Sequence, residues 1–330
     1  MSTPSPSRTP PPTWAGTQTA RETANQIVLG FLAVLPLLTL AFDEPFYLEL
    51  FSRVMVYAIA ALSLDLILGY GGMVSFGHAA FLGVGAYTVG ILSYYGIDSA
   101  FLQWPAAILL SALAALVIGY VSLRTTGVYF IMITLAFAQM LFYFFTSLEA
   151  YGGDDGLTIW TLSEFFGPIS LDDDLTLYYV IFAVLGGCLY LSHRLVHSRF
   201  GRVLQGIKSN EARMRAIGYP TKRYKLLAFV ISGTMCGLAG VLLANQAEFV
   251  APSYLAWHRS GELIVMVLLG GMGTLFGPVI GAVAFMLLAH FLADLTIYWP
   301  VIFGPFLIAV VLFGRGGLYG LIGKMGGRNG

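Results

Sequence analysis

Ten apolar stretches, most of them long enough to span a membrane, cover most of the chain. An α-helix needs about 20 apolar residues to cross the roughly 30 Å hydrocarbon core of a bilayer. The stretches lie at about 26–42, 49–70, 74–95, 102–123, 126–147, 175–193, 225–247, 262–272, 276–294 and 298–314. They are continuous and lack the alternation of membrane β-barrel strands. The sequence predicts an all-α, polytopic transmembrane helical bundle with about ten spans, in which the short stretch 262–272 is broken or re-entrant.

The scarcity of charge excludes a soluble enzyme carrying a single anchor. Only 10% of the 330 residues are charged and 58% are hydrophobic, whereas an ordinary soluble domain has about 25% charged residues. The two cysteines, Cys188 and Cys236, both lie inside apolar stretches. This placement excludes a disulfide framework or a cysteine-based zinc site, and we expect both thiols to be packing residues.

The few charges are unevenly placed and predict an orientation. Nine of the seventeen basic residues fall within the basic loop, residues 194–225. Residues 149–174 form an acidic loop with seven Asp or Glu residues and no basic residue. Because basic loops stay on the cytoplasmic side, we expect the basic loop inside and the acidic loop outside. Counting ten crossings then places both termini in the cytoplasm.

The two ends of the chain differ from the apolar middle. Residues 1–24 are rich in Pro, Ser and Thr, a composition that predicts a disordered cytoplasmic tail. Residues 25–315 would form the transmembrane domain, and residues 316–330 a cytoplasmic C-terminal tail. The stretch 26–42 also has features of a signal peptide, with a weak cleavage match at Thr39-Leu40-Ala41. We favour a retained first span, because a long Arg-bearing leader precedes it.

The basic loop has the pattern of two short helices joined by a turn. Four apolar side chains fall on one helix face: Phe200, Val203, Leu204 and Ile207. Ser209 or Asn210 can cap a second helix with Glu211 in its first turn, and Gly218 followed by Pro220 can end it. The ordered stop favours a helix pair that docks on a partner through its apolar stripe. The alternative is a basic anchor lying on anionic lipid.

Glycines are concentrated where close packing or a broken helix is needed. A glycine in a helix interior costs about 1 kcal/mol relative to alanine, yet residues 69–90 contain seven of them. The segment GGMVSFG (71–77) also resembles GGMGTLFG (270–277). This similarity is either chance between glycine-rich segments or the mark of two corresponding broken helices around a pathway.

Glycines that recur every fourth residue predict close helix contacts. One pair is Gly233 and Gly237, and one series is Gly273, Gly277 and Gly281. Each set would lie on one helix face, packed either inside the chain or against a second subunit.

A few polar residues inside the apolar stretches are candidates for the pathway. Asp65 lies in a span, where an ionisable group costs a few kcal/mol. It is therefore either a functional residue or the acceptor of a structural bond to a serine or a freed backbone group. Ser75 and His78 either satisfy freed backbone groups or contact substrate, and no acid that would complete a catalytic Ser–His pair is evident nearby. The pathway candidates are Asp65, Gly72, Ser75, Gly77, His78, Gly271 and Gly273.

Two further patterns point to no cofactor site. Gly201 and Gly206 are spaced as in a phosphate-binding loop, but Ile207 displaces Lys208 by one position and no strand precedes the glycines. His193 and His197 are four residues apart, but arginines crowd them and no carboxylate accompanies them. We therefore expect no cofactor or metal in this chain.

Four segments resemble the permeases of ABC importers for branched-chain amino acids, most closely the M-type subunit. They are GYGGMVSFGHAAFLGVGAY (69–87), YGGDDGLT (151–158), HSRFGRVLQGIKSNEARMRAIGYPTKRYKLLAFVISG (197–233) and RSGELIVMVLLGGMGTLFGPVIGA (259–282). The resemblance covers nearly the whole chain after about residue 45. One departure is that Glu211-Ala212 precedes Arg213, with Gly218 seven residues after the glutamate. The contacts of the general importer signature therefore cannot be transferred directly.

The resemblance implies a transport subunit, not an enzyme, in a bacterial cytoplasmic membrane. It implies a homologous second permease, two ATP-binding subunits that hold ATP and Mg²⁺, and an external solute-binding protein, with no role for nucleic acid. The residues expected to couple to the ATPase are Phe200, Gly201, Arg202, Val203, Leu204, Ile207, Asn210, Glu211, Ala212, Arg213 and Gly218. Relatives that carry urea or short amides leave the substrate open. A self-contained secondary transporter is the alternative class, for which only Asp65 is a good carboxylate.

Overall fold

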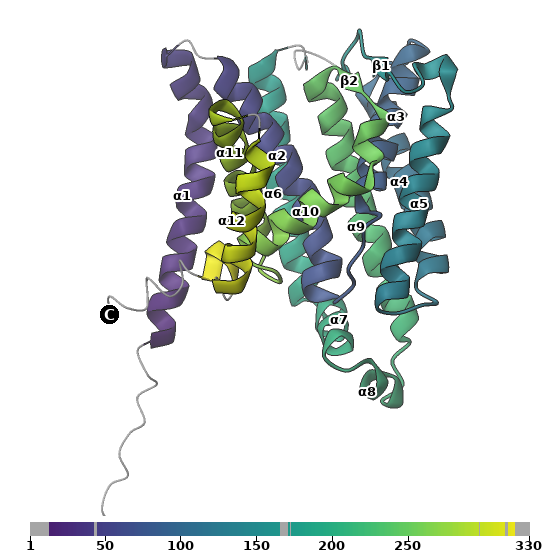
Figure 1. Ribbon diagram of the computed structural model, residues 1–330, viewed down its shortest axis with the longest axis vertical. Helices are drawn as coiled ribbons and strands as arrows, with labels where there is room; N and C mark the ends of the chain where they lie inside the picture. The colour runs from purple at the N-terminus through teal and green to yellow at the C-terminus, as the bar shows by residue number, and fades with distance from the viewer. Residues whose placement is uncertain are drawn as a thin grey trace, which may run out of the picture.

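The chain folds into a bundle of helices that run roughly along one common direction (Figure 1). The computed structural model describes residues 13–42, 45–165, 171, 173–296, 298–313 and 316–320. The helices of the bundle are α1 (Thr13–Phe42), α2 (Pro45–Asp65), α3 (His78–Tyr94), α4 (Ala100–Ser122), α5 (Val128–Thr146), α6 (Asp174–His197), α9 (Thr221–Ala247), α10 (Trp257–Gly270), α11 (Gly277–Leu295) and α12 (Trp299–Phe313). The shorter elements are η1 (Leu66–Tyr70), η2 (Glu149–Tyr151), β1 (Leu157–Thr158), α7 (Arg199–Ser209), α8 (Glu211–Ala216), β2 (Phe249–Val250) and η3 (Pro252–Leu255).

The predicted all-α membrane bundle is confirmed. Among the described residues, six helical segments are long and apolar enough to cross a membrane: α2 with η1, α4, α5, α6, α9 and α11. Each of the ten apolar stretches of the sequence overlaps one helix of the bundle. Helix α10 has only 14 residues and, at 1.5 Å per residue, is about 21 Å long, which is shorter than a bilayer core. The count of ten spans stays a prediction.

Helices α2, α3 and α9 form the buried centre, and glycines set how closely α9 approaches its neighbours. A Cβ atom at Gly85 of α3 would meet the carbonyl of Gly237 in α9, and one at Gly240 would meet the carbonyl of Leu82. Gly233 packs in the same way against Phe81 and Ala115. The predicted close-packing face of α9 is therefore internal. Cys236, on the same helix, is buried and free, as is Cys188.

The second predicted glycine series only partly forms a helix face. Gly277 and Gly281 belong to α11, and a Cβ at Gly281 would meet the backbone of Met266 in α10. Gly273 precedes the helix and has a positive φ of 75°, a conformation that favours glycine. The prediction of three glycines on one helix face was therefore wrong for Gly273, because its backbone leaves the helical region.

The basic and acidic loops lie at opposite ends of the bundle, as Figure 1 shows. The end that carries α7 and α8 is called the basic end below. The opposite end carries η2 and the two-stranded antiparallel pair in which Leu157 faces Val250. This separation agrees with the predicted opposite placement of the two loops. Which end faces the cytoplasm stays a prediction that rests on the positive-inside rule.

The terminal segments are more structured than the sequence suggested. Helix α1 begins at Thr13, directly after the last proline of the N-terminal cluster. The expected disorder of residues 1–24 was therefore wrong for 13–24, and residues 1–12 lie outside the described part of the chain. Within the predicted C-terminal tail 316–330, residues 316–320 pack on the bundle, where Tyr319 is buried and receives a hydrogen bond from Asn25.

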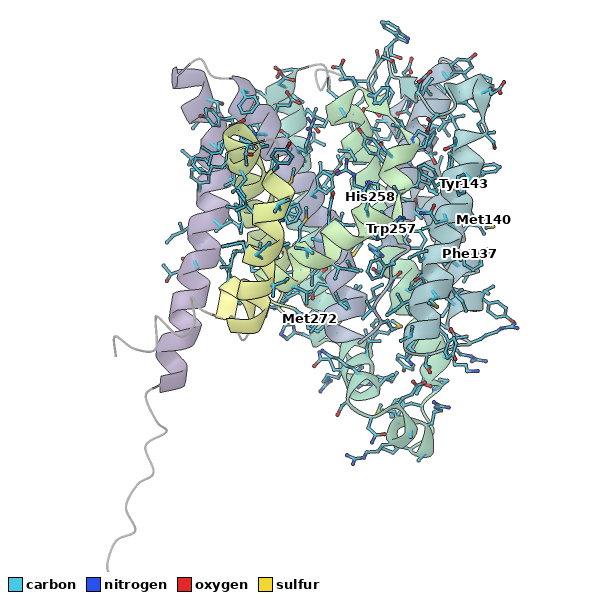
Figure 2. The ribbon with its side chains drawn as sticks, in the orientation of Figure 1. Phe137, Met140, Tyr143, Trp257, His258 and Met272 are labelled. Atoms are coloured by element: carbon cyan, nitrogen blue, oxygen red, sulfur yellow. The ribbon has the colours of Figure 1, made fainter. Side chains whose placement is uncertain are left out.

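Helices α4 and α5 form a largely exposed apolar wall. Figure 2 labels Phe137, Met140 and Tyr143 along α5, and the latter two are more than half exposed. Such a wall has to be covered by lipid or by another apolar subunit. Its exposure fits an integral, multi-pass membrane protein.

Candidate functional site

Two glycine-containing breaks interrupt the bundle near its basic end. The first break, residues 71–77, follows the π-helical turn η1 that ends α2. The second break, residues 271–276, follows α10. Gly72 and Gly271 adopt positive φ values of 68° and 124°, which only glycine adopts freely. The two segments that resemble each other in sequence therefore occupy the same kind of position, between the end of one helix and the start of the next.

Asp65 connects the first helix break to the second. Its buried Oδ1 accepts a hydrogen bond from the backbone N–H of Gly273 at 2.8 Å. A Cβ atom at Gly69 would fall on both groups, so glycine is required for this approach. Of the two roles considered for Asp65, the structure shows the bond to a freed backbone group. Any contact of Asp65 with substrate stays a prediction.

Lys208 connects the basic loop to the same place. Its Nζ donates a hydrogen bond to the carbonyl oxygen of Gly69 at 2.5 Å. Its aliphatic stem lies against Gly72, where an added Cβ would be 3.0 Å from the Lys208 Cγ. Helix α7 is thus hydrogen-bonded to the π-helical turn and packed on the first break. The sequence contains no signal for this contact, because nothing distinguishes Lys208 from the other basic residues of the basic loop.

The other pathway candidates of the first break are buried and bonded within the chain. The Nε2 of His78 lies 2.8 Å from the Ser63 hydroxyl of α2, and both residues are fully buried. The Ser75 hydroxyl accepts a hydrogen bond from the Gly77 N–H at 3.3 Å. Gly77 also approaches the carbonyl of Thr134 in α5. These contacts pin the start of α3 to its neighbours, and a direct role in the pathway stays a prediction.

The two helices of the basic loop form as their capping residues predict. The side chain of Asn210 accepts a hydrogen bond from the Arg213 N–H at 2.9 Å and caps α8. Gly218, with a φ of 99°, ends the helix, and its N–H donates to the Arg215 carbonyl. Ser198 caps α7 in the same way as Asn210 caps α8, by accepting from the Gly201 N–H, a role the sequence reading missed.

The apolar stripe of α7 faces inward, which corrects one prediction. Val203, Leu204 and Ile207 are buried within this chain, and the ring of Phe200 stacks on Tyr224 of α9 at 5.7 Å. The stripe was expected to be the docking surface for a partner. Helical periodicity shows that a face is apolar but not what covers it, and here the protein's own helices cover it.

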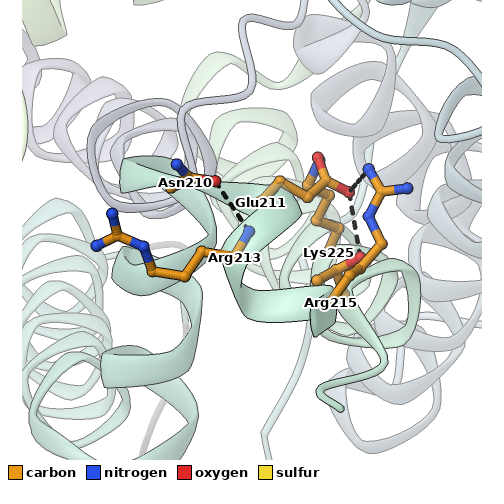
Figure 3. A network of polar contacts seen from close by, with 6 residues as sticks. Asn210, Glu211, Arg213, Arg215 and Lys225 are labelled. Atoms are coloured by element: carbon orange, nitrogen blue, oxygen red, sulfur yellow. Dashed lines mark hydrogen bonds and ion pairs between the residues drawn. The ribbon is translucent and has the colours of Figure 1, made fainter. Parts of the chain in front are cut away.

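Glu211 fixes α8 to the start of α9 (Figure 3). Its carboxylate pairs with Lys225, lies 3.3 Å from the Arg215 guanidinium and accepts a hydrogen bond from the Thr221 hydroxyl at 3.1 Å. Partial burial acts to raise the pKa of Glu211, but the hydrogen bonds and positive charges of these partners outweigh it. The pKa is therefore lower than that of an ordinary glutamate. The network makes α8 a braced element.

The exposed surface of the helix pair centres on α8 and the residues that follow it. Ile217 and Tyr219 directly follow α8 and are 65% and 39% exposed. Ala212 and Arg213, on α8 itself, are also exposed. An exposed aliphatic and an exposed aromatic side chain, close in sequence to the exposed Arg213 and Arg215, have the composition of an interface anchor with a charged rim. Arg202, on α7, instead lines a cavity beside α6.

Comparison with known proteins places this bundle in a family. The model of the family described as branched-chain amino acid transport system / permease component matches residues 46–314. The chain belongs to that family. The match covers the central helices, both breaks and the whole basic loop, and it places the chain among transport permease components.

Individual relatives are similar over most of this chain. Permease protein LivM of the high-affinity branched-chain amino acid transport system from Salmonella typhimurium is 28% identical, covering 87% of this chain and 74% of its own. The permease LivH of the same organism is 25% identical over 80% of this chain and 91% of its own. The autoinducer 2 import permease LsrC of Enterobacter sp. is 28% identical over 78% of this chain and 76% of its own. No solved structure matches the chain.

Proposed function

We propose that this chain is the membrane permease subunit of an ATP-driven ABC importer of branched-chain amino acids in a bacterial inner membrane. An external binding protein would deliver the substrate, and a second homologous permease would complete the pathway. The observation that carries this proposal is the braced helix pair α7–α8, which exposes Ile217 at its tip and is bonded to the first break through Lys208.

The structure suggests a route from an ATPase to the pathway. A partner that docks on α8 and the following residues would move a rigid element, because Glu211 pairs α8 to α9. Helix α7 precedes α8 and is separated from it only by Asn210, and Lys208 of α7 donates a hydrogen bond to the carbonyl of Gly69. Gly69 in turn lies against Gly273, so the motion would reach both breaks. ATP and Mg²⁺ would be bound by the ATPase pair.

The partners and substrate come to this chain from its relatives. LivM and LivH are both named as permeases of high-affinity branched-chain amino acid transport systems, which supports pairing with a homologous permease. The exposed apolar wall of α4 and α5 is an available surface for such a partner or for lipid. The pathway would run beside the breaks, near Gly72, Ser75, His78 and Gly273. The autoinducer 2 relative makes substrate identity a point for direct measurement.

Reconstituted transport tests the proposal. The permease pair would be placed in proteoliposomes with its ATPase and binding protein, and uptake of labelled leucine would be measured with and without ATP. We expect ATP-dependent uptake, which Ile217→Asp abolishes together with co-purification of the ATPase, while Ile217→Val retains both. Uptake that needs no ATP would contradict the importer assignment. Uptake of only urea, short amides or autoinducer 2 would contradict the substrate.

A further inference from the structure

A large cavity opens at the basic end between α1, α6 and α7. Its volume is about 890 Å³, and the second break and Tyr319 complete its wall. In Figure 1 the lower part of α1 stands away from the rest of the bundle on this side. From α7 the cavity is lined by Arg202 and Gln205, whereas the proposed coupling route uses Lys208, so that route does not account for the cavity.

The lining of the cavity combines positive charge with apolar surface. Arg202, His193 and His197 contribute basic groups, while Leu189, Val196 and Phe276 are apolar. Among the residues that the structure describes, no Asp or Glu lines the cavity. The carboxylate closest in sequence to the lining residue Tyr70 is Asp65, and it already accepts a hydrogen bond from the Gly273 N–H. The cavity therefore attracts an anion that also carries apolar groups.

Two polar groups in this lining, the Arg202 guanidinium and the Asn25 side-chain oxygen, have no partner within the described residues. The guanidinium of Arg202 forms no ion pair there, although acidic side chains pair with Arg53, Arg215 and Arg259. The Oδ1 of Asn25 is buried and accepts no hydrogen bond from any described group. A buried unpaired acceptor costs about 1–3 kcal/mol, so a ligand that donates a hydrogen bond to Asn25 would remove that cost.

The position of the cavity matches the boundary between hydrocarbon and water. His193 and His197 lie in the last turns of the apolar helix α6, and the exposed Tyr190 sits one turn earlier, with the Arg194 guanidinium 6.0 Å from its ring centroid. Tyrosines mark membrane interfaces in helical membrane proteins. Basic pockets between helices at the cytoplasmic side bind the headgroups of anionic lipids.

We infer that this cavity binds the headgroup of an anionic phospholipid with free hydroxyls, such as phosphatidylglycerol. Its phosphate would pair with Arg202, a headgroup hydroxyl would donate to Asn25 Oδ1, and an acyl chain would leave along the apolar side of α6. The lipid would thereby bridge α1 to the first turn of α7. A soluble phosphate shares the anionic chemistry but offers nothing to the apolar lining.

Lipid retention by the purified transporter complex tests this inference. The complex would be exchanged into nanodiscs of phosphatidylcholine with or without phosphatidylglycerol, and bound lipid would be counted by native mass spectrometry. We expect phosphatidylglycerol to be retained over phosphatidylcholine. Arg202→Gln should reduce that retention roughly fivefold, because one basic group near an anionic membrane surface contributes about that factor to lipid affinity. Gln205→Trp should reduce it by filling the cavity while leaving every charge in place.

Arg223→Gln is the matched control, because Arg223 is exposed at the same end but does not line the cavity. The inference predicts that this variant retains the lipid. Equal retention of both lipids by the wild-type complex would overturn it, as would equal loss in Arg223→Gln and Arg202→Gln. Binding of inorganic phosphate in detergent without any lipid preference would assign the cavity to a soluble anion and overturn the lipid assignment.

Discussion

The ammonium of Lys208 donates a hydrogen bond to the carbonyl of Gly69, 139 residues earlier in the chain, across 2.5 Å. This bond joins the helix pair of the basic loop to the π-helical turn that precedes the first break. Gly69 also touches Asp65 and Gly273, so three segments far apart in sequence meet at one carbonyl and its neighbours. The proposed coupling between ATPase and pathway depends on this junction.

Lys208→Met should weaken coupling while preserving assembly. Methionine keeps most of the aliphatic stem that packs on Gly72 but cannot donate to Gly69. A hydrogen bond from a charged group contributes about 1.5 kcal/mol or more, which corresponds to roughly tenfold in an equilibrium. We expect leucine transported per ATP hydrolysed to fall by about that factor, as measured in proteoliposomes.

Lys222→Met serves as the control for this change, since Lys222 is exposed at the start of α9. Normal transport per ATP is expected there. The coupling role of Lys208 would be excluded if Lys208→Met transported as efficiently as the wild type.

Substitutions of Asp65 separate a structural role from a role of its charge. Asp65→Asn retains an oxygen that accepts from the Gly273 N–H, whereas Asp65→Ala leaves that donor without a partner at a cost of about 1–3 kcal/mol. We expect Asp65→Asn to fold and transport nearly normally, and Asp65→Ala to unfold at lower temperature in detergent. A stable Asp65→Asn protein without transport would instead show that the carboxylate charge participates in the pathway.

The lowered pKa of Glu211 predicts how α8 responds to acid. A carboxylate with a lowered folded-state pKa stabilises its contacts fully above the usual glutamate pKa of about 4.3, and this contribution disappears as the pH falls through the lowered value. Hydrogen-exchange protection of α8 should therefore be constant near neutral pH and decline only below about pH 4. Glu211→Gln should reduce the protection of α8 at pH 7 about fivefold, because the lost ion pair contributes about 1 kcal/mol. The same variant should show no decline in protection below pH 4. Identical acid profiles for both proteins would refute this role.

The contact between α3 and α9 predicts that Gly85 tolerates no side chain. A methyl group at Gly85 would meet the carbonyl of Gly237, so Gly85→Ala should lower the yield and melting temperature of the folded permease. Gly186→Ala is the matched control, because nothing lies within 4 Å of the added Cβ in α6. There, the gain in helix propensity of up to about 1 kcal/mol should leave stability unchanged or raised. Equal melting of the two variants would contradict the packing described.

Much of the architecture follows from local pattern. Every apolar stretch overlaps a helix, because a helix satisfies its own backbone hydrogen bonds inside a bilayer. The ends of α8 follow from Asn210 and Gly218, whose side-chain and backbone chemistry act within a few residues. The shared position of the two breaks agrees with the similarity of 71–77 to 270–277.

The remaining features depend on contacts that local pattern does not contain. The inward direction of Leu204 and Ile207 was missed, because an apolar face fits the protein's own helices as well as a partner. The bond from Lys208 to Gly69 and that from Gly273 to Asp65 join residues more than 100 positions apart. Each uses a backbone group of a glycine, which the residue type does not mark as a partner. The helical start at Thr13 was missed, because the prolines just before it made the whole segment 1–24 look disordered.

A reversible cross-link between α7 and the first break tests the coupling account most directly. A Cβ at Gly72 would lie 3.6 Å from the Cβ of Lys208, within the range of a disulfide. In a chain lacking Cys188 and Cys236, Gly72→Cys with Lys208→Cys should hydrolyse ATP but transport poorly when reduced, since the bond to Gly69 is absent. Oxidation should restore leucine transport per ATP by rejoining the two segments, while Gly72→Cys alone should not respond. Because Gly72 has a positive φ of 68°, transport by Gly72→Cys with Lys208 intact measures the effect of the strained side chain by itself. Cross-linked protein that transports no more leucine per ATP than the reduced protein would contradict the coupling role of this contact.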